Sequence, residues 1–462
     1  MQAEDKTSKP NFILVLIDDL GYGAITPYGN LYQSMPGLQK MREQGMLFTD
    51  AYVTPQCTPT RASLLTGQHT ARNRMWHVVP EYGFPYAKMK EPEYLENLPR
   101  ETYTLAKALQ NQGYVTACLG KWHLNTYESG DGYYTYLWDS ARQYYGFDYV
   151  NPVQDPQNYH QRGDKGVEFL TDEAIDFIER NQEQPFFIYL SQHTIHGPVL
   201  APDSTVEKYK AKGWPYKHQN VQKVNYPTNA TYLAALEHID HSMVRLQEKL
   251  EALNLRENTV LIFLSDNGGV DIEFENYPLR YGKGSPYEGG IRVPFIVSWP
   301  GTIPSNSTDS TPVHVTDFYP TIVDLAGGKL PENHPVDGKS LKPVFLKNGQ
   351  LNRETLYWYT PLYDIQWGAT PSAIIREGNY KLIHFFGDHI DLEDSSKYIP
   401  EPKTVLFDLS QDLQESNDIS REEPELTTRL RNKLMHWIDS MEAPLPTVNP
   451  NYNPDSVFYR PR

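Results

Sequence analysis

The sequence predicts an α/β protein built on a large mixed, mostly parallel sheet flanked by helices. A smaller antiparallel sheet with a closing helix is expected at the C-terminal end. Three observations lead to this fold class. Short continuous apolar segments, typical of buried parallel strands, are interspersed with amphipathic helical segments. Charged or titratable side chains directly follow several of the apolar segments, and from about residue 345 short strand-like segments joined by turns take over.

Length and composition set the outer limits of the interpretation. A chain of 462 residues suits one large α/β unit, expected at 10–345, plus a smaller α+β subdomain at 346–462. Hydrophobic residues make up 39% of the chain and charged residues 22%, which is enough for a sizeable core. The formal net charge of −16 argues against nucleic acid as a partner. No apolar run reaches the ~18–20 residues needed to cross a bilayer, so no membrane partner is expected.

The elements follow from the apolar pattern and from helix start and stop signals. Buried strands are expected at 11–17, 114–119, 185–190, 259–264 and 295–299. Helices are expected at 37–45, 102–112, 167–180, 232–253 and 423–441, with a further helix starting after His314. A threonine at its start should cap the helix at 102–112, and Gly113 should stop it. The strand-like segments of the C-terminal part lie at 372–376, 380–385 and 405–408.

Four predicted strands end in side chains that can do chemistry, and a fifth is preceded by a lysine. The residues in question are Asp18 and Asp19, Lys121 and His123, His193 and His196, Asp266 and Asn267, and Lys283. Open α/β sheets place their active site at the carboxyl edge of the strands, so these groups should converge. Carboxylate and amide oxygens suit Ca²⁺ or Mg²⁺, although a solvated turn is the alternative for an Asp-Asp pair. With the cationic groups beside it, such a site fits an ester of sulfate or phosphate.

The segment from Cys57 to Arg61 reads Cys-Thr-Pro-Thr-Arg and is followed by Thr-Gly at 66–67. It resembles the C-x-P-x-R signature of the formylglycine-dependent sulfatases. The alternative is a buried cysteine before a helix. Thr58 or Thr60 is expected to cap the helix that continues through Ala62, and its N-terminus would favour an anionic group at residue 57. The chain is similar to the same family at 16–23, 120–123, 265–269, 283–294 and 406–417.

This resemblance implies an alkaline-phosphatase-like fold and a sulfatase mechanism. Cys57 would be converted to formylglycine by a maturation enzyme, and its hydrate would attack sulfur to give a covalent sulfo-enzyme. The implied ligands of a Ca²⁺ ion, with Mg²⁺ as the alternative, are Asp18, Asp19, Asp266, Asn267 and the modified Cys57. Arg61 would orient the hydrate, and Lys121 and Lys283 would neutralise the sulfate oxygens. The implied proton donor to the leaving alcohol is His196, with His193 as its competitor, and His123 would take the proton that regenerates the aldehyde.

The expected substrate is a sulfated poly- or oligosaccharide, and Tyr-rich segments at 125–160 and 200–228 are expected to be irregular and to line its cleft. Other interpretations stay open: a broad-range arylsulfatase, a phosphoester or phosphonate-ester hydrolase of the same superfamily, and an inactive glycan-binding relative. With only Cys57 and Cys118, no disulfide framework is expected. We expect a periplasmic or secreted protein whose signal peptide has been removed.

Overall fold

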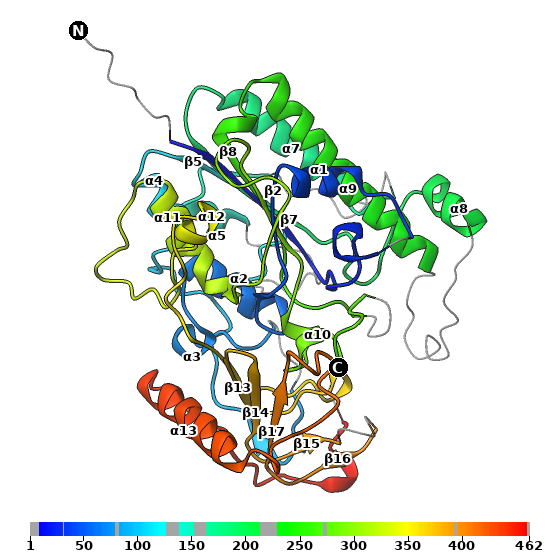
Figure 1. Ribbon diagram of the computed structural model, residues 1–462, viewed down its shortest axis with the longest axis vertical. Helices are drawn as coiled ribbons and strands as arrows, with labels where there is room; N and C mark the ends of the chain where they lie inside the picture. Colours follow the sequence, from blue (N-terminus) through cyan, green and yellow to red (C-terminus); the bar gives the residue numbers. More distant parts are fainter. Residues whose placement is uncertain are drawn as a thin grey trace.

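The computed structural model describes residues 9–30, 32–78, 83–125, 138–151, 163–212, 229–270, 275–391, 394 and 396–459. Its main feature is an eight-stranded sheet that crosses the upper part of the molecule (Figure 1). In spatial order the strands are β10 (Ser307–Asp309), β2 (Gly45–Phe48), β9 (Phe295–Ser298), β8 (Thr259–Ser265), β1 (Asn11–Ile17), β7 (Phe186–Gln192), β5 (Val115–Gly120) and β6 (Tyr149–Val150). The strands from β8 to β6 are parallel, whereas β9 runs antiparallel to both β8 and β2. The predicted mixed, mostly parallel sheet is therefore confirmed.

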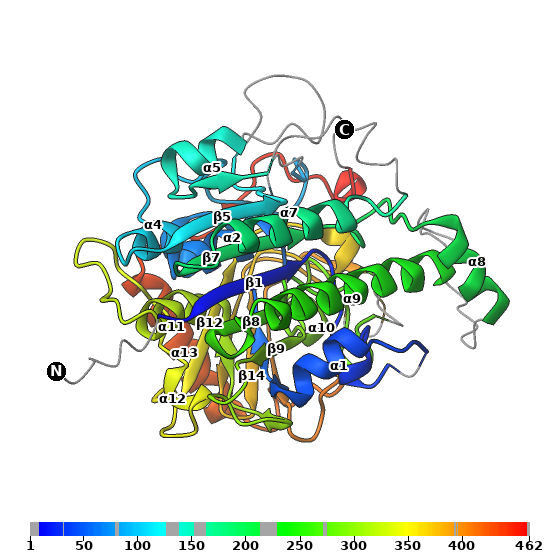
Figure 2. The ribbon, with the colours of Figure 1, turned by 90° about the horizontal axis from the view of Figure 1, so that it is seen from above.

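Helices cover both faces of this sheet, which explains why its strands are apolar on both sides. Along β1, Phe12, Leu14 and Leu16 face one core cluster, and the alternate residues face the other. One face carries α1 (Pro36–Glu43), α7 (Val167–Arg180) and α9 (Asn229–Ala252), seen from above in Figure 2. The other carries α2 (Cys57–Thr66), α4 (Leu105–Gln110), α5 (Trp138–Tyr144), α11 (Phe318–Leu325) and α12 (Lys342–Phe345).

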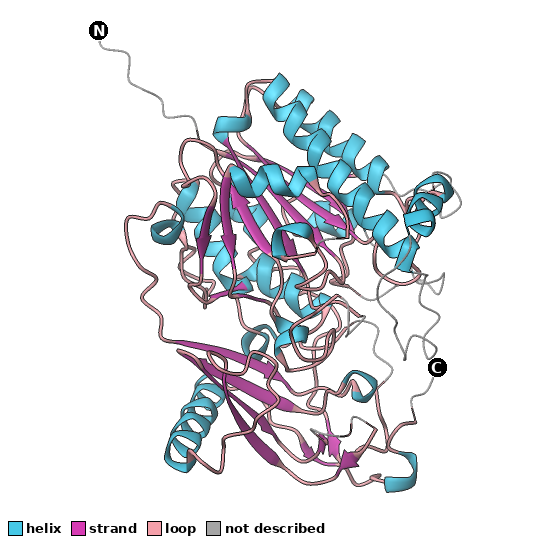
Figure 3. Cartoon of the chain, turned by 45° about the vertical axis from the view of Figure 1, so that its right-hand side comes forward, coloured by secondary structure: helices cyan, strands magenta, loops and turns pink. Residues whose placement is uncertain are grey.

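A second, antiparallel sheet lies below the main one (Figure 3). Its strands are β12 (Thr355–Thr360), β13 (Ser372–Glu377), β14 (Tyr380–Phe385) and β17 (Lys403–Asp408), in that order. Helix α13 (Pro424–Ser440) closes one face by burying Leu430 and Leu434. The smaller antiparallel sheet and its closing helix are confirmed. We propose that the subdomain boundary lies at 345/346, just after α12.

The remaining elements are short. The helical ones are η1 (Thr26–Tyr28), α3 (Thr70–Asn73), α8 (Asp203–Lys212), η3 (Arg256–Asn258), α10 (Glu288–Ile291), η4 (Val315–Asp317), η5 (Ile365–Trp367) and η6 (Pro454–Ser456). The strand pairs are β3 (Ala51–Tyr52) with β11 (Val313–His314), β4 (Met89–Lys90) with β18 (Thr447–Val448), and β15 (His389–Ile390) with β16 (Tyr398–Ile399). Among the described helices, none combines the length and the apolar character that crossing a membrane requires.

Several local predictions were wrong, each because tertiary contacts overrode a local signal. The helix expected at 37–45 ends at Glu43, because Gly45 already starts β2 beside the backbone of β9. Helix α2 begins at Cys57 with Gln56 as its N-cap, so neither Thr58 nor Thr60 caps it. Thr60 lies inside the helix, and its hydroxyl instead accepts from the backbone N–H of Thr54 at 3.0 Å.

The predicted capping threonine of the helix at 102–112 also lies at a different position. Helix α4 begins only at Leu105, and its cap is Thr104, whose hydroxyl accepts from the backbone N–H of Lys107. Of the segments expected to be irregular, 203–212 forms helix α8, and 138–151 contains α5 and β6. Of the two expected cleft segments, residues 126–137, 152–160 and 213–228 lie outside the described residues.

Candidate active site

The parallel strands β1, β5, β7 and β8 deliver their following residues to one edge of the main sheet. The backbone N–H of Asp18 donates to Gln192 O, and that of Asp266 donates to Ile17 O, so the ends of β1, β7 and β8 are in register. Lys121 is held next to them by its N–H, which donates to Ser191 O. Because β9 runs the other way, its first residues, and the loop that carries Lys283, reach the same edge. The predicted convergence is therefore observed.

Arg61 occupies the centre of this group and is fully buried. Its Nε and Nη2 donate to Asp266 Oδ2 at 3.1 and 2.7 Å, and its Nη1 donates to the carbonyl of Lys121 at 2.9 Å. The hydroxyls of Tyr189 and Ser191, on β7, also accept from Nη1. These charge-assisted hydrogen bonds connect helix α2 to β7 and to the residues that follow β5 and β8. They therefore fix the position of residue 57.

The two lysines each form an ion pair with one member of the Asp-Asp pair. Lys121 Nζ lies 2.6 Å from Asp18 Oδ2, and Lys283 Nζ lies 2.7 Å from Asp19 Oδ1. Burial alone would raise the pKa of Asp18, but Lys121, His196 and Arg61 together hold it well below its usual range. Burial and the charge of Asp18 raise the pKa of Asp266 instead. The side-chain amide of Asn267 donates to Asp19 Oδ1 at 2.8 Å, so Asn267 belongs to the same hydrogen-bonded cluster.

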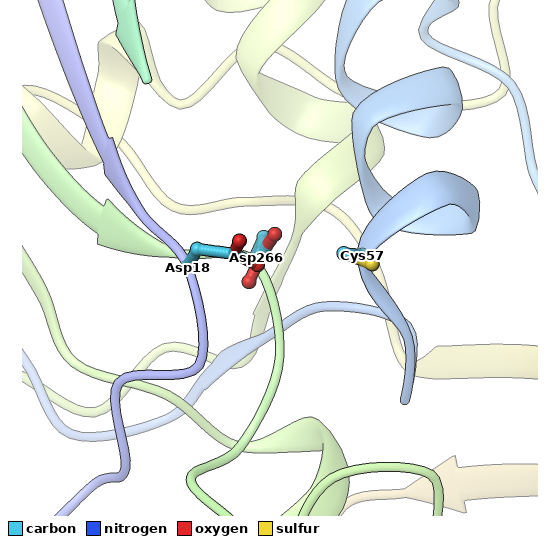
Figure 4. Close-up of side chains that lie close together, drawn as sticks. All are labelled: Asp18, Cys57 and Asp266. Carbon is cyan, nitrogen blue, oxygen red and sulfur yellow. The ribbon is translucent and has the colours of Figure 1, made fainter. Parts of the chain in front are cut away.

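The residues present fit a divalent cation. Two buried oxygens, Asp18 Oδ1 and Asn267 Oδ1, have no hydrogen-bond partner, which is costly unless a cation binds them. Ligand atoms of Asp18, Cys57 and Asp266 all lie within 4.8 Å of one another. The close-up in Figure 4 shows these three side chains and the elements that carry them. Oxygen donors of this kind are hard ligands that suit Ca²⁺ or Mg²⁺.

Cys57 is the first residue of α2, and its Sγ lies within 4.8 Å of a carboxylate oxygen of Asp18 and of Asp266. The free N–H groups of a first helical turn favour a negative charge at this position. His123 also contacts Cys57, with Nδ1 3.3 Å from Sγ. Its backbone adopts a left-handed conformation at φ 56°, which bends the chain back after β5. Cys118, by contrast, is buried in the core within β5.

His196 lies beside Asp19, with Nε2 3.9 Å from Asp19 Oδ2. Its Nδ1 contacts Gly197 O at 2.9 Å, and because a carbonyl only accepts, Nδ1 carries the proton and Nε2 faces the site. Burial and the charge of Lys283 lower the pKa of His196 to about 3. The competing His193 is more deeply buried, and burial lowers its pKa to about 3 as well.

The structure adds one cation that the sequence did not reveal. Lys165 lies in the turn before α7, and its Nζ donates to the carbonyls of His196 and Pro198. It is 2% exposed. Neither a strand end nor a motif marks this lysine in the sequence, so only the packing of α7 against β7 could have shown its place.

The comparisons with known proteins agree with this geometry. A family model described as Sulfatase matches residues 10–328, and one described as N-sulphoglucosamine sulphohydrolase, C-terminal, matches residues 280–441. A protein named Sulfatase from Formosa agariphila is 29% identical, and the match covers 96% of this chain and 91% of that protein. An arylsulfatase of Hemicentrotus pulcherrimus is 30% identical over 84% of this chain and 69% of its own length.

Among solved structures, that of Ps i-CgsB superimposes with a TM-score of 0.73 at 26% identity. The match covers 96% of this chain and 95% of that one, and the same protein has been crystallised in complex with k-i-k-neocarrahexaose. The matched segments include each strand end and loop that forms the site described above. The chain therefore belongs to the sulfatase family, the sulfuric ester hydrolases with the alkaline-phosphatase-like fold.

Proposed function

We propose that this protein hydrolyses sulfate esters on a sulfated poly- or oligosaccharide, with residue 57 as the nucleophile in its formylglycine form. One observation carries the proposal. Cys57 stands at a helix N-terminus, among carboxylates that can hold a cation and beside two lysines that can bind an oxyanion. A cysteine in a merely structural role needs none of these neighbours.

The proposed nucleophile, a formylglycine hydrate, has two hydroxyl groups on one carbon, which an ordinary side chain lacks. A formylglycine hydrate would supply one hydroxyl for attack on sulfur and a second one to release the sulfate afterwards. The residues around position 57 suit this chemistry, because the N–H groups of α2 and the positive charge of the Arg61 guanidinium favour negative charge there. His123, at 3.3 Å, can take the proton of the second hydroxyl.

We infer that the cation is Ca²⁺, held by Asp18, Asp19, Asp266 and Asn267. When bound, it would act as a Lewis acid towards a sulfate oxygen and the nucleophile. The net charge of the pocket follows from the charged side chains that line it. Three carboxylates are balanced by Arg61, Lys121 and Lys283, so a divalent cation leaves the pocket positive. A locally positive pocket reconciles an anionic substrate with a protein of net charge −16.

His196 is the proposed acid for the leaving alcohol. Its Nε2 faces the site because Gly197 O holds the proton on Nδ1. In the free protein the imidazole is neutral, since burial and Lys283 lower its pKa to about 3. A bound sulfate ester brings negative charge beside Lys283, which raises the pKa of His196 and favours the protonated donor.

The carbohydrate substrate is supported by the relative that was crystallised with k-i-k-neocarrahexaose, whose fold covers 96% of this chain. A substrate of this kind is a polymer found outside the cell, so we propose a periplasmic or secreted location. We further propose that a separate maturation enzyme oxidises Cys57 before the protein becomes active.

The test is sulfate release, measured by ion chromatography, from a panel of sulfated oligosaccharides in the presence of Ca²⁺. Peptide mass spectrometry first establishes that Cys57 has been converted, and an aryl sulfate and an aryl phosphate are assayed alongside. Sulfate from one sugar class, abolished in Cys57→Ala, supports the proposal and names the substrate. Release from the aryl sulfate alone makes the protein a broad-range arylsulfatase. Phosphate without sulfate makes it a phosphoester hydrolase, and converted protein that binds the oligosaccharides without turning over any ester makes it an inactive glycan-binding relative.

A further inference from the structure

We propose that Lys165 is a positioning residue for His196: it fastens the turn that carries the acid. The inference rests on the proposed role of His196 and adds a residue outside the motifs of the family. The Nζ of Lys165 donates to the carbonyl of His196 and, at 3.1 Å, to the carbonyl of Pro198. The two acceptors lie at either end of the His196-Gly197-Pro198 turn, so one ammonium group spans it.

The backbone conformation just before α7 directs the side chain of Lys165 into the protein interior. Lys165 has φ 53° and Gly166 φ 85°, so two successive residues are left-handed. For a residue other than glycine this conformation costs of order 1 kcal/mol and persists only where the surroundings hold it. Asp164 does so, because its carboxylate accepts the backbone N–H groups of Gly166 and Glu168 at 3.0 and 3.1 Å. The strain and its support both favour a specific role for the side chain.

The surroundings of Lys165 explain why a cation stands there. It is 2% exposed, and none of the described carboxylates forms an ion pair with it. Burial lowers its pKa to about 8, so the ammonium form still predominates at neutral pH. A buried cation with only carbonyl acceptors is costly, but its charge-assisted bonds hold a turn more firmly than neutral ones do. The bond from Lys165 restrains His196 directly, because the carbonyl that accepts it belongs to His196.

The position of His196 matters most when the leaving group is a poor one. A sugar alkoxide must be protonated as the S–O bond breaks, whereas a nitrophenolate leaves without help. Misplacing a catalytic group by about 1 Å costs of order 10²-fold in rate. Loss of the Lys165 bonds should therefore slow substrates with poor leaving groups far more than those with good ones.

The experiment compares Lys165→Met with wild type on aryl sulfates of graded leaving groups, from 4-nitrophenyl to 4-methylphenyl sulfate. Lys210→Met serves as the matched control, because Lys210 is exposed on α8 and forms a surface ion pair with Glu207. We expect kcat/KM to fall by about 10²-fold for the poorest leaving group and by less than about 10-fold for 4-nitrophenyl sulfate. In a His196→Ala background, Lys165→Met should add no further leaving-group dependence. The control should match wild type throughout.

An equal fall for all leaving groups, or an additive effect with His196→Ala, would overturn the positioning role. Crystal structures provide a readout that does not need turnover: the 196–198 turn should shift in Lys165→Met, and an unmoved turn contradicts the proposal. If the methionine variant does not fold, Lys165→Gln, which keeps a single donor group, takes its place with an intermediate effect expected. Failure of the proposed function would look different, because wild type itself would then turn over no sulfate ester.

Discussion

Lys381 offers the sharpest test of how the small sheet is joined to the active-site loop. It lies on β14 and is fully buried, with Nζ 3.0 Å from Glu288 Oε1 and 2.8 Å from Glu415 Oε1. Glu288 begins α10, a few residues after Lys283. Replacing Lys381 with methionine keeps the length of the side chain and removes the cation that forms the ion pair with Glu415.

The expected loss of stability in Lys381→Met depends on which of the two carboxylates, Glu288 and Glu415, keeps a partner. Glu288 retains Arg292, at 3.2 Å, and the hydroxyl of Tyr52, at 2.7 Å. Within the described part of the chain, the carboxylate of Glu415 keeps just the bond that it accepts from the backbone N–H of Glu288. Removing one partner of a buried pair costs about 3–5 kcal/mol. With an unfolding entropy of about 2.1 cal/mol/K per residue, this cost lowers the Tm of a chain of 462 residues by roughly 3–5 °C.

The stability cost of Lys381→Met should depend on pH, because Glu415 titrates in the accessible range. Burial, partly offset by Lys381, raises the pKa of Glu415 to about 7, above its ordinary value of 4.5. A carboxyl with a raised folded pKa costs stability as pH rises from 4.5 through that pKa. Without Lys381 the pKa of Glu415 rises further. The Tm deficit of Lys381→Met should therefore be larger at pH 8 than at pH 5.5.

Differential scanning calorimetry at the two pH values checks this, with Lys381→Met/Glu415→Gln as the companion variant. Because the double variant leaves no carboxylate without its counter-charge at position 415, it should recover more than half of the lost Tm. The reasoning is refuted if the single variant matches wild type at pH 8, or if the double variant is no more stable than the single one.

Three further predictions concern the cation, an acid-sensitive cluster and a glycine. Millimolar Ca²⁺ should raise the Tm of wild type through binding to the folded state, and Asp18→Asn, which removes a proposed ligand, should abolish that rise; an equal rise in both would contradict the ligand set. Glu168 contacts His241 and has a pKa lowered to about 2, so its stabilisation is present above 4.5 and lost as pH falls towards 2. In acid-unfolding curves Glu168→Gln should lose less stability than wild type over that window, and parallel curves would contradict this. At Gly120, which has φ 93°, an added Cβ would lie 1.9 Å from Ser191 O. Gly120→Ala should thus sharply lower the yield of folded protein, whereas normal yield and Tm would show that the β5 end can relax.

Local patterns in the sequence were sufficient for the central strands of the main sheet and for the long helices α7, α9 and α13. The helix at 167–180 and the strand at 380–385 were predicted with the bounds that the structure has, because their apolar periodicity is strong and uninterrupted. The strand ends were also predictable, since a continuous apolar run stops abruptly at a charged residue such as Asp18 or Asp266. The signature at Cys57 predicted the sulfatase family, which the match to the family model confirms.

Only the tertiary structure decided what those residues touch. The insertion of β9 between β2 and β8, the capping of α4 by Thr104, and the reach of Lys165 to the turn after β7 each depend on contacts between distant segments. Hydrophobic periodicity reports which face of an element is buried, but carries no information about its partner. The sequence alone therefore determined the fold class and the candidate chemistry of the site. The folded chain determined how that chemistry is held, because burial and hydrogen bonding are properties of neighbours in space.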